Sequence, residues 1–147
     1  GPQGLQGPQG GQGPKGDTGD RGPSEAFVKV VDDSLNIVDG GTAEPVATLT
    51  GLPAGAYLIL ANVPLYRGVG DSLSDCTLTV GTTSVTKVAG LVAAVPALDL
   101  VWQETVELPT GGDAVMACRD HLGVSTGDAG VQRPTIVAIR VGTVTTR

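Results

Sequence analysis

The sequence predicts a collagen triple helix followed by an all-β, jelly-roll β-sandwich, and two patterns in its 147 residues support this prediction. Residues 1–24 have glycine at every third position, whereas residues 25–147 alternate apolar and polar side chains between clusters of Gly, Pro and Asp. The first pattern is typical of collagen and the second of many short strands. We therefore expect two domains, a stalk over residues 1–24 and a globular head over residues 25–147.

The stalk consists of eight unbroken Gly-X-Y triplets. Three chains in polyproline II conformation meet at an axis where only glycine fits, so the strict period predicts a homotrimer and a rod on the order of 70 Å long. A flexible glycine-rich linker, the alternative, has no reason to keep glycine in phase. The glycines of the predicted triple helix are Gly1, Gly4, Gly7, Gly10, Gly13, Gly16, Gly19 and Gly22.

Charged side chains are expected to stabilise this stalk. Proline occupies the second position of the triplets and never the third, where hydroxyproline stabilises animal collagens, which favours a bacterial or phage source. Ion pairs between staggered chains are expected instead, at about 0.2–1 kcal/mol each when exposed, so the stalk alone should be marginal. The residues expected to form these pairs are Lys15, Asp17, Asp20 and Arg21.

The tripeptide Lys15-Gly16-Asp17 also matches the pattern of an integrin-binding motif, in which the carboxylate completes the metal site of the receptor. The same tripeptide arises in the frame of any charged collagen. We therefore favour charge stabilisation as its role.

The charge and hydropathy of the chain exclude several partner classes. The charges of the stalk cancel, so the net charge of −6 belongs to the head, which disfavours nucleic acid and anionic membranes as partners. No apolar run approaches about 18 residues, so no membrane insertion is expected in this segment. The N-terminus lies within the repeat and carries no secretory signal, so we expect a longer parent protein whose signal or anchor lies elsewhere.

Nine segments of the head are predicted as strands because their apolar residues recur with period two between turn residues. They are residues 26–31, 35–38, 45–50, 56–65, 75–80, 83–89, 98–108, 113–119 and 134–145. Residues 89–97 are predicted as a loop because Pro96 interrupts them. Eight or nine strands in about 120 residues predict a two-sheet jelly roll. Large rings are scarce, so subunit contacts are expected to contribute to stability.

Four stretches of the head carry a family resemblance, namely Leu52–Leu65, Cys76–Val80, Val106–Cys118 and Pro134–Val144. They resemble the heads of actinobacterial collagen-repeat proteins, bacterial collagen-like proteins whose trimeric C-terminal heads are similar to the C1q and tumour necrosis factor fold. The resemblance implies a trimeric jelly roll and a surface location. It implies no ligand.

The two cysteines, Cys76 and Cys118, each lie in a predicted strand beside apolar or β-branched residues. In an exported fibre they are expected to form one disulfide within the head. The alternative is two buried free thiols in a cytosolic protein. Zinc is not predicted, because His121 is the only other soft ligand available to them.

Catalytic residues and cofactors are not predicted. The sequence offers no nucleophile with a base, no carboxylate pair in an evident cleft and no metal cluster, so we expect no enzymatic activity. His121 follows a strand and is interpreted as a surface loop residue. Four acids in Gly- or Ser-containing loops could collect calcium, although turn-forming, solvated acids are the favoured interpretation. They are Asp32, Asp33, Asp71 and Asp75.

The predicted function is structural. Three heads associate, bring the chains into register at residues 25–27, and let the triple helix form from there toward the N-terminus. The partners are two further copies of the chain and, for adhesion at a cell or spore surface, a glycan or protein receptor. The alternative is a phage tail fibre or virion tip of the same architecture. A soluble recognition molecule similar to C1q conflicts with the proline placement.

Overall fold

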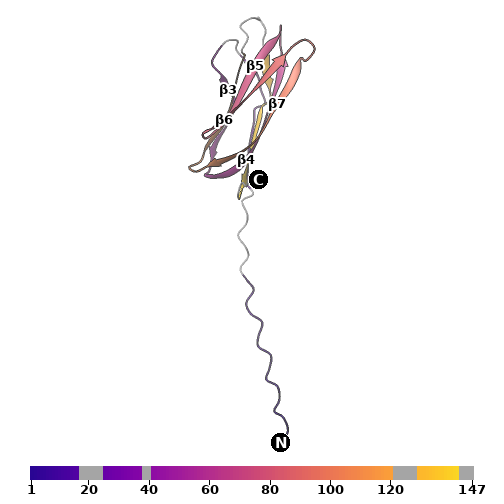
Figure 1. The fold of residues 1–147 in the computed structure, drawn as a ribbon, viewed down its shortest axis with the longest axis vertical. Helices are drawn as coiled ribbons and strands as arrows, with labels where there is room; N and C mark the ends of the chain where they lie inside the picture. The colour runs from indigo at the N-terminus through magenta and orange to yellow at the C-terminus, as the bar shows by residue number, and fades with distance from the viewer. Residues whose placement is uncertain (17–24, 38–40, 121–128, 143–147) are drawn as a thin grey trace.

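The computed structural model describes residues 1–16, 25–37, 41–120 and 129–142 of the chain. Residues 1–16 are extended and exposed, without regular secondary structure, and the head is built from strands (Figure 1). Among the described residues there is no helix that could span a membrane. The strands are β1 Ala26–Val30, β2 Ser34–Ile37, β3 Glu44–Leu52, β4 Gly55–Arg67, β5 Ser72–Val80, β6 Thr83–Leu91, β7 Ala97–Leu108, β8 Gly112–Asp120, β9 Ala129–Gln132 and β10 Thr135–Val141.

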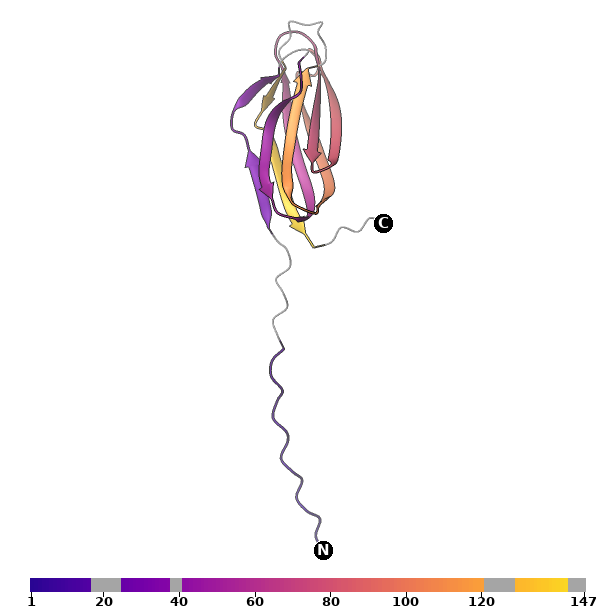
Figure 2. The same cartoon turned by 90° about the vertical axis from the view of Figure 1, so that its left-hand side faces the viewer.

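Two antiparallel sheets form the sandwich (Figure 2). In the first sheet β4 pairs with β7 on one side, and on the other side with β10 and then β9. Strand β1 pairs with β10, and β2 pairs with β9. The second sheet has the order β3-β8-β5-β6.

The first sheet is effectively four strands wide, because β9 and β10 form one interrupted line and β1 and β2 form the next. The interruption lies at Arg133, which adopts a φ of 50°, and Pro134 follows it. Two sheets of four lines, with the chain crossing between them at most connections, have the connectivity of a jelly roll. The predicted all-β jelly roll is therefore confirmed for the head.

The predicted strands are all present, with boundaries that differ by a few residues. Strand β9, Ala129–Gln132, was not predicted; its four residues are too short to show alternation, and Gly130 weakens the pattern further. The last predicted strand was too long, because β10 ends at Val141. The predicted loop over 89–97 begins later than expected, since β6 continues to Leu91.

Most of the core is aliphatic, as the scarcity of rings predicts, but two large rings are fully buried in it. Trp102 on β7 and Tyr57 on β4 are both 0% exposed. The indole Nε1–H of Trp102 donates to the carbonyl of Val85 on β6 over 3.0 Å. Lys87, also on β6, lies 5.6 Å from the centre of the Trp102 ring and donates to the carbonyl of Val101. These two side chains close the edge of the sandwich between β6 and β7, and they cover edge groups that could otherwise pair with another strand.

Connections differ between the two ends of the sandwich. At the end where β1 begins and β10 ends, here called the base, β3–β4, β5–β6 and β7–β8 are joined by tight turns. The β7–β8 turn needs glycine at Gly111, where φ is 81° and an added Cβ would lie 2.6 Å from the carbonyl oxygen of Leu52. At the opposite end, the tip, the described connections include residues 68–71 and 92–96. These two described connections are longer than the turns at the base.

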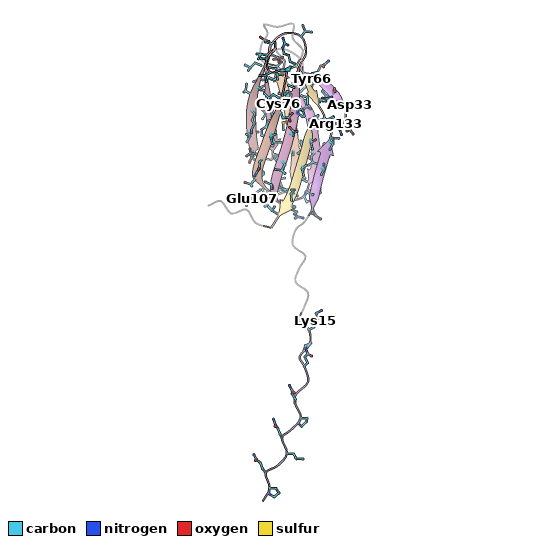
Figure 3. All side chains as sticks on the ribbon, turned by 90° about the vertical axis from the view of Figure 1, so that its right-hand side faces the viewer. Lys15, Asp33, Tyr66, Cys76, Glu107 and Arg133 are labelled. Atoms are coloured by element: carbon cyan, nitrogen blue, oxygen red, sulfur yellow. A yellow bond between two sulfur atoms is a disulfide. The ribbon has the colours of Figure 1, made fainter. Side chains whose placement is uncertain are left out.

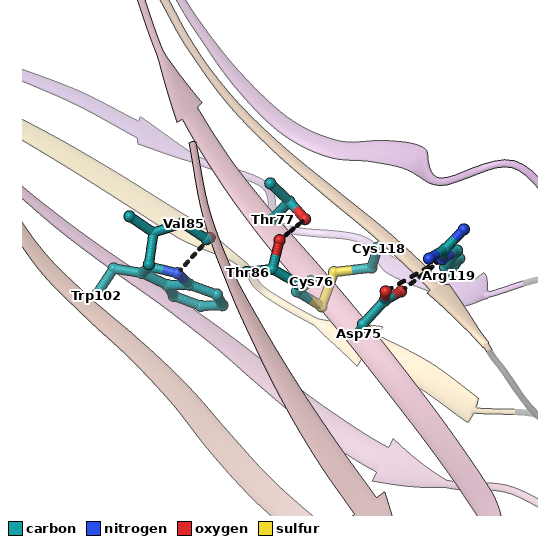
Figure 4. The surroundings of a disulfide bond; sticks show 8 residues. All are labelled: Asp75, Cys76, Thr77, Val85, Thr86, Trp102, Cys118 and Arg119. Atoms are coloured by element: carbon teal, nitrogen blue, oxygen red, sulfur yellow. Dashed lines mark hydrogen bonds and ion pairs between the residues drawn. A yellow bond between two sulfur atoms is a disulfide. The ribbon is translucent and has the colours of Figure 1, made fainter. Parts of the chain in front are cut away.

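The predicted disulfide forms between Cys76 on β5 and Cys118 on β8 (Figure 4). The two residues face each other in the strand register, with their Cα atoms 4.1 Å apart, and both are fully buried. Beside them on the outer face, Arg119 Nε donates to both carboxylate oxygens of Asp75, at 2.9 and 3.1 Å. The disulfide thus joins the two middle strands of the second sheet.

We expect the double substitution Cys76→Ala with Cys118→Ala to lower the free energy of unfolding of the head by roughly 3 to 4 kcal/mol. The bond closes a loop with a sequence separation of 42, and its removal returns that chain entropy to the unfolded state. Equilibrium denaturation would measure the loss, and reductant should change the stability of the wild type but not of the variant. Equal stability of the oxidised and reduced wild type would contradict this role.

Candidate interaction surface

The outer faces of the two sheets differ in chemistry. On the second sheet, hydroxyl groups on the outer face of β5 and β6 bond to one another: Thr77 to Thr86 at 2.7 Å, and Thr79 to Ser84 at 3.0 Å. The same face also carries apolar side chains, including Val88 on β6 and Val115 on β8. Asp75 and Arg119 extend the same face, and the hydrogen bond and charge of Asp75 raise the pKa of Arg119 further above its usual value. The hydroxyl and charged groups of this face are readily solvated by water.

The outer face of the first sheet is mainly apolar on β1, β10 and β4, whereas β7 contributes Val101 among polar outward side chains such as Gln103 and Thr105. On β4, residues such as Tyr57 and Ile59 point into the core, so the residues between them point outward. The strand register places these outward side chains beside those of the neighbouring strands. We call this surface the apolar face. Its residues are Ala26, Val28 and Val30 on β1, Ile139 and Val137 on β10, Leu58 and Leu60 on β4, and Val101 on β7.

Exposure on the apolar face is large at its flanks. Val28 is 58% exposed, Val30 41% and Val101 55%, while Leu58 and Leu60 between them are half-buried by their neighbours. None of the described elements lies over this face. A contiguous apolar surface on a sheet is typical of a protein–protein interface, because burying it removes apolar area from water at about 25 cal/mol per Å².

An aromatic side chain borders the apolar face toward the tip (Figure 3). The ring of Tyr66 on β4 lies directly over Gly130 on β9, where an added Cβ would come within 2.0 Å of the ring. The Tyr66 hydroxyl reaches the side-chain oxygen of Asn36 on β2, at 3.4 Å. Gly130 therefore creates the space that lets Tyr66 lie flat across the sheet. Neither residue was singled out from the sequence.

The base of the same sheet holds the first residue of the head. The backbone N–H of Arg140 donates to the carbonyl of Glu25 over 2.8 Å, and Arg140 Nη1 is 3.2 Å from the Glu25 carboxylate. Phe27 packs edge-on against Tyr57, with ring centres 6.3 Å apart, and the Tyr57 hydroxyl donates to the carbonyl of Pro53 over 2.8 Å. The chain is thus fixed at the point where it enters the head.

Burial raises the pKa of Tyr57 above its ordinary value of 10.0; nearby Arg140 opposes this shift and Glu25 adds to it. The folded state therefore disfavours the phenolate. Stability from the neutral ring is fully present below the unfolded-state pKa of about 10, and it is lost as pH rises through the higher folded-state pKa.

We expect Tyr57→Phe to reduce the alkaline loss of stability. Denaturant titrations between about pH 8 and 11 would compare the free energy of unfolding of the wild type and the variant. The phenylalanine variant loses the bond to Pro53 and starts less stable, by about 1 kcal/mol, but its curve should fall less steeply above about pH 10. Parallel curves would contradict a contribution from Tyr57.

The four acids considered for calcium are separated, and three of them lie beside an arginine. Asp32 is 3.0 Å from Arg133 Nη2, Asp71 is 3.5 Å from Arg67 Nε, and Asp75 bonds to Arg119. Asp33 is exposed. Within the described residues no group of three or more His, Cys, Asp or Glu side chains is arranged to hold a metal ion. The structure therefore does not bring the four carboxylates together.

Several residues singled out in the stalk lie outside the described part of the chain: Asp17, Gly19, Asp20, Arg21 and Gly22, together with His121 in the head. Lys15 is described and exposed. A Cβ added at any of the six described glycines that begin a triplet, Gly1, Gly4, Gly7, Gly10, Gly13 and Gly16, would meet no atom within 4 Å. No contact within a single chain therefore requires glycine at these positions.

No protein-family model matches the chain, and no curated protein matches it. Similar solved structures include VP2 in a subviral particle of infectious bursal disease virus, with a TM-score of 0.55 and 11% identity over 81% of this chain and 34% of that one. Eiger TNF from S. frugiperda aligns with a TM-score of 0.50 and 9% identity, over 84% of this chain and 96% of that one. The globular domain of zebrafish complement 1qA aligns with a TM-score of 0.47 and 11% identity, over 83% of this chain and 99% of that one.

The chain spans about a third of the length of the viral protein and nearly all of the Eiger chain. At this level of identity, the first two likenesses show the fold. They agree with the strand connectivity, which is that of a jelly roll.

Proposed function

We propose that this chain is a non-enzymatic structural and interaction protein that works as a homotrimer. Residues 1–24 form one strand of a collagen triple helix, and residues 25–147 form a head that associates with two copies of itself. The head brings the three chains into register and starts triple-helix formation. Its tip presents a binding surface, for a glycan or protein receptor, at the end of the stalk.

The observation that carries this proposal is the contrast between the two outer faces of the head. One face carries hydrogen-bonded hydroxyls and an arginine–aspartate pair beside a few apolar side chains, and the other is mainly apolar over the three lines formed by β1, β10 and β4. A head that uses the apolar face to contact its own copies would bury that surface and leave the polar face to water. The glycine period of the stalk sets the number of copies at three.

The position of β1 supports a link between head association and stalk assembly. Strand β1 contributes Ala26, Val28 and Val30 to the apolar face, and Glu25 directly precedes it. Association through this face therefore brings the three copies of Glu25 close together, one residue after the last Gly-X-Y triplet. Three weakly associating stalks then meet at high effective concentration.

The disulfide supports an extracellular location, because such bonds persist in oxidising compartments. The placement of proline in the stalk supports a bacterial or phage source. For a bacterial source we propose a fibre at a cell or spore surface that mediates adhesion. The described loops at the tip, residues 68–71 and 92–96, lie at the end of the head opposite Glu25, where a receptor would be met.

Two valines of nearly equal exposure offer a matched test of the interface. Val28 on the apolar face is 58% exposed, and Val88 on the outer face of the second sheet is 57% exposed. We expect Val28→Lys to dissociate the trimer at micromolar concentration, since three ammonium groups would be buried at the contact, and Val88→Lys to leave it intact. Sedimentation equilibrium would give the mass of each, with circular dichroism to confirm that the heads are folded. A trimer in both variants, or a monomeric wild type, would refute the proposed interface.

A peptide of residues 1–24 tests the role of the head in stalk formation. We expect it to melt far below the full chain, because exposed ion pairs worth about 0.2–1 kcal/mol each cannot offset the entropy of joining three free chains. The positive far-ultraviolet circular dichroism band of the triple helix, followed with temperature, measures both. If peptide and full chain melted together, the head would have no nucleating role.

A second function of the same architecture is a phage tail fibre or virion tip that binds a receptor. The likeness in fold to VP2 of infectious bursal disease virus, at a TM-score of 0.55, favours keeping it as the alternative. Both functions need a trimeric rod with a stable tip. The sequence that precedes the repeat in the parent protein distinguishes them, since a signal peptide or wall anchor indicates a cell surface and a baseplate-binding domain indicates a phage.

A further inference from the structure

Arg140, near the end of β10, makes contacts at the base that join the start of the head to a turn far away in the sequence. Its backbone N–H and its Nη1 both bond to Glu25, at 2.8 and 3.2 Å. Its Nη2 donates to the carbonyl of Ala54, in the turn between β3 and β4, over 2.8 Å. One guanidinium therefore connects the residue that follows the stalk repeat to the base of the central strand β4.

The path of this side chain is built into the base. An added Cβ at Gly55 would lie 2.8 Å from Arg140 Nε and 3.5 Å from Cζ, so the absence of a side chain there lets the guanidinium lie against β4. The Arg140 side chain is 34% exposed, which is less than the 60% of Glu25. The ion pair is therefore supported by packing and by a second hydrogen bond, unlike an isolated surface pair.

A second contact anchors the same segment to the same turn. Phe27, two residues after Glu25, packs on Tyr57, whose hydroxyl donates to the carbonyl of Pro53, the neighbour of Ala54. Two side chains of the entering segment are thus held by β4 and β10. These strands also supply the centre of the apolar face.

Another arginine pair of the same sheet lacks this construction. Arg133 Nη2 lies 3.0 Å from Asp32, with side chains 65% and 80% exposed. No described contact carries the Arg133 guanidinium on to a third segment. The Arg133–Asp32 pair therefore serves as a control for the Arg140–Glu25 pair, because it is exposed and lies away from the point where the stalk joins the head.

We propose that Arg140 is the positioning residue that couples the head to the stalk, by fixing where and in which direction each of the three chains leaves the head. This inference rests on the proposed function. We call the bonds of Arg140 to Glu25 and Ala54 the clamp. With the clamp closed, Glu25 has a defined position, and the last triplets of the three chains start close together. With the clamp open, the residues before Phe27 act as a longer, looser linker, which lowers the effective concentration of the three stalks.

The test uses the full chain with Arg140→Gln and Glu25→Gln, and Arg133→Gln as the matched control. Three quantities are measured for each: the mass by sedimentation equilibrium, the midpoint of the triple-helix circular dichroism band, and the midpoint of the head from the fluorescence of buried Trp102. We expect both junction variants to remain trimers with a near wild-type head midpoint and a lowered stalk midpoint. Arg133→Gln should leave the stalk midpoint unchanged. Removing the carboxylate charge through Glu25→Gln leaves the bond from Arg140 to Ala54 available, so it separates the coupling from a simple loss of head stability.

Wild-type stalk midpoints in both junction variants would overturn the coupling role while leaving the trimeric head and stalk in place. A stalk midpoint that falls equally in Arg133→Gln would also overturn it, because the effect would then belong to surface charge in general. If Glu25→Gln lowered the head midpoint as much as the stalk midpoint, the ion pair would be a stability contact of the head and not a coupler. A wild type with no triple-helix transition would remove the proposed function and this inference together.

Discussion

The architecture of this chain depends on the apolar face of the first sheet. A two-sheet sandwich needs only one buried face per sheet, and the outer face of the second sheet carries hydrogen-bonded threonines and an arginine–aspartate pair among its side chains. The first sheet has a core-facing set that includes Ile59 and Ile136 and a second apolar set on its other side. Water is a poor solvent for that second set, so covering it with another surface would stabilise the head.

The stalk and the head are both explained by association with other copies of the chain. Glycine at every third residue has no cause within one chain, because the described stalk glycines have no atom near the place of a side chain. The requirement arises only where three chains meet. The head has an uncovered face that includes the strand next to the stalk. In the proposed trimer, three copies satisfy the requirements of both parts. The head holds the three chains close together, and the stalk carries the head away from its point of attachment.

Sequence reasoning identified what local pattern encodes. Period-two alternation in 98–108 predicts β7, and its buried set, Leu100, Trp102, Val106 and Leu108, follows that alternation. The apolar face also left a signal: residues 56–65 and 134–139 read as nearly continuous apolar runs, which is typical of strands covered on both sides. The clamp between Arg140 and Glu25 left no signal in the sequence. It joins residues 115 positions apart, and it depends on Gly55 in a third segment. Strand β9 was missed for a similar reason, since its pairing with β2 and β4, and not its own four residues, makes it a strand.

An apolar face on a sheet carries a risk of open-ended association, and the edge strands of this head limit it. Strand β7 borders the apolar face and has a free side, where unpaired backbone groups could add a further strand. There Lys87 covers the carbonyl of Val101, and Trp102 in turn binds the carbonyl of Val85 on the opposing sheet. The two sheets are thereby tied together at their shared edge. Strand addition at this edge is thereby disfavoured, and in the proposed trimer a closed ring of three copies would bury the apolar face without leaving a site for a fourth copy.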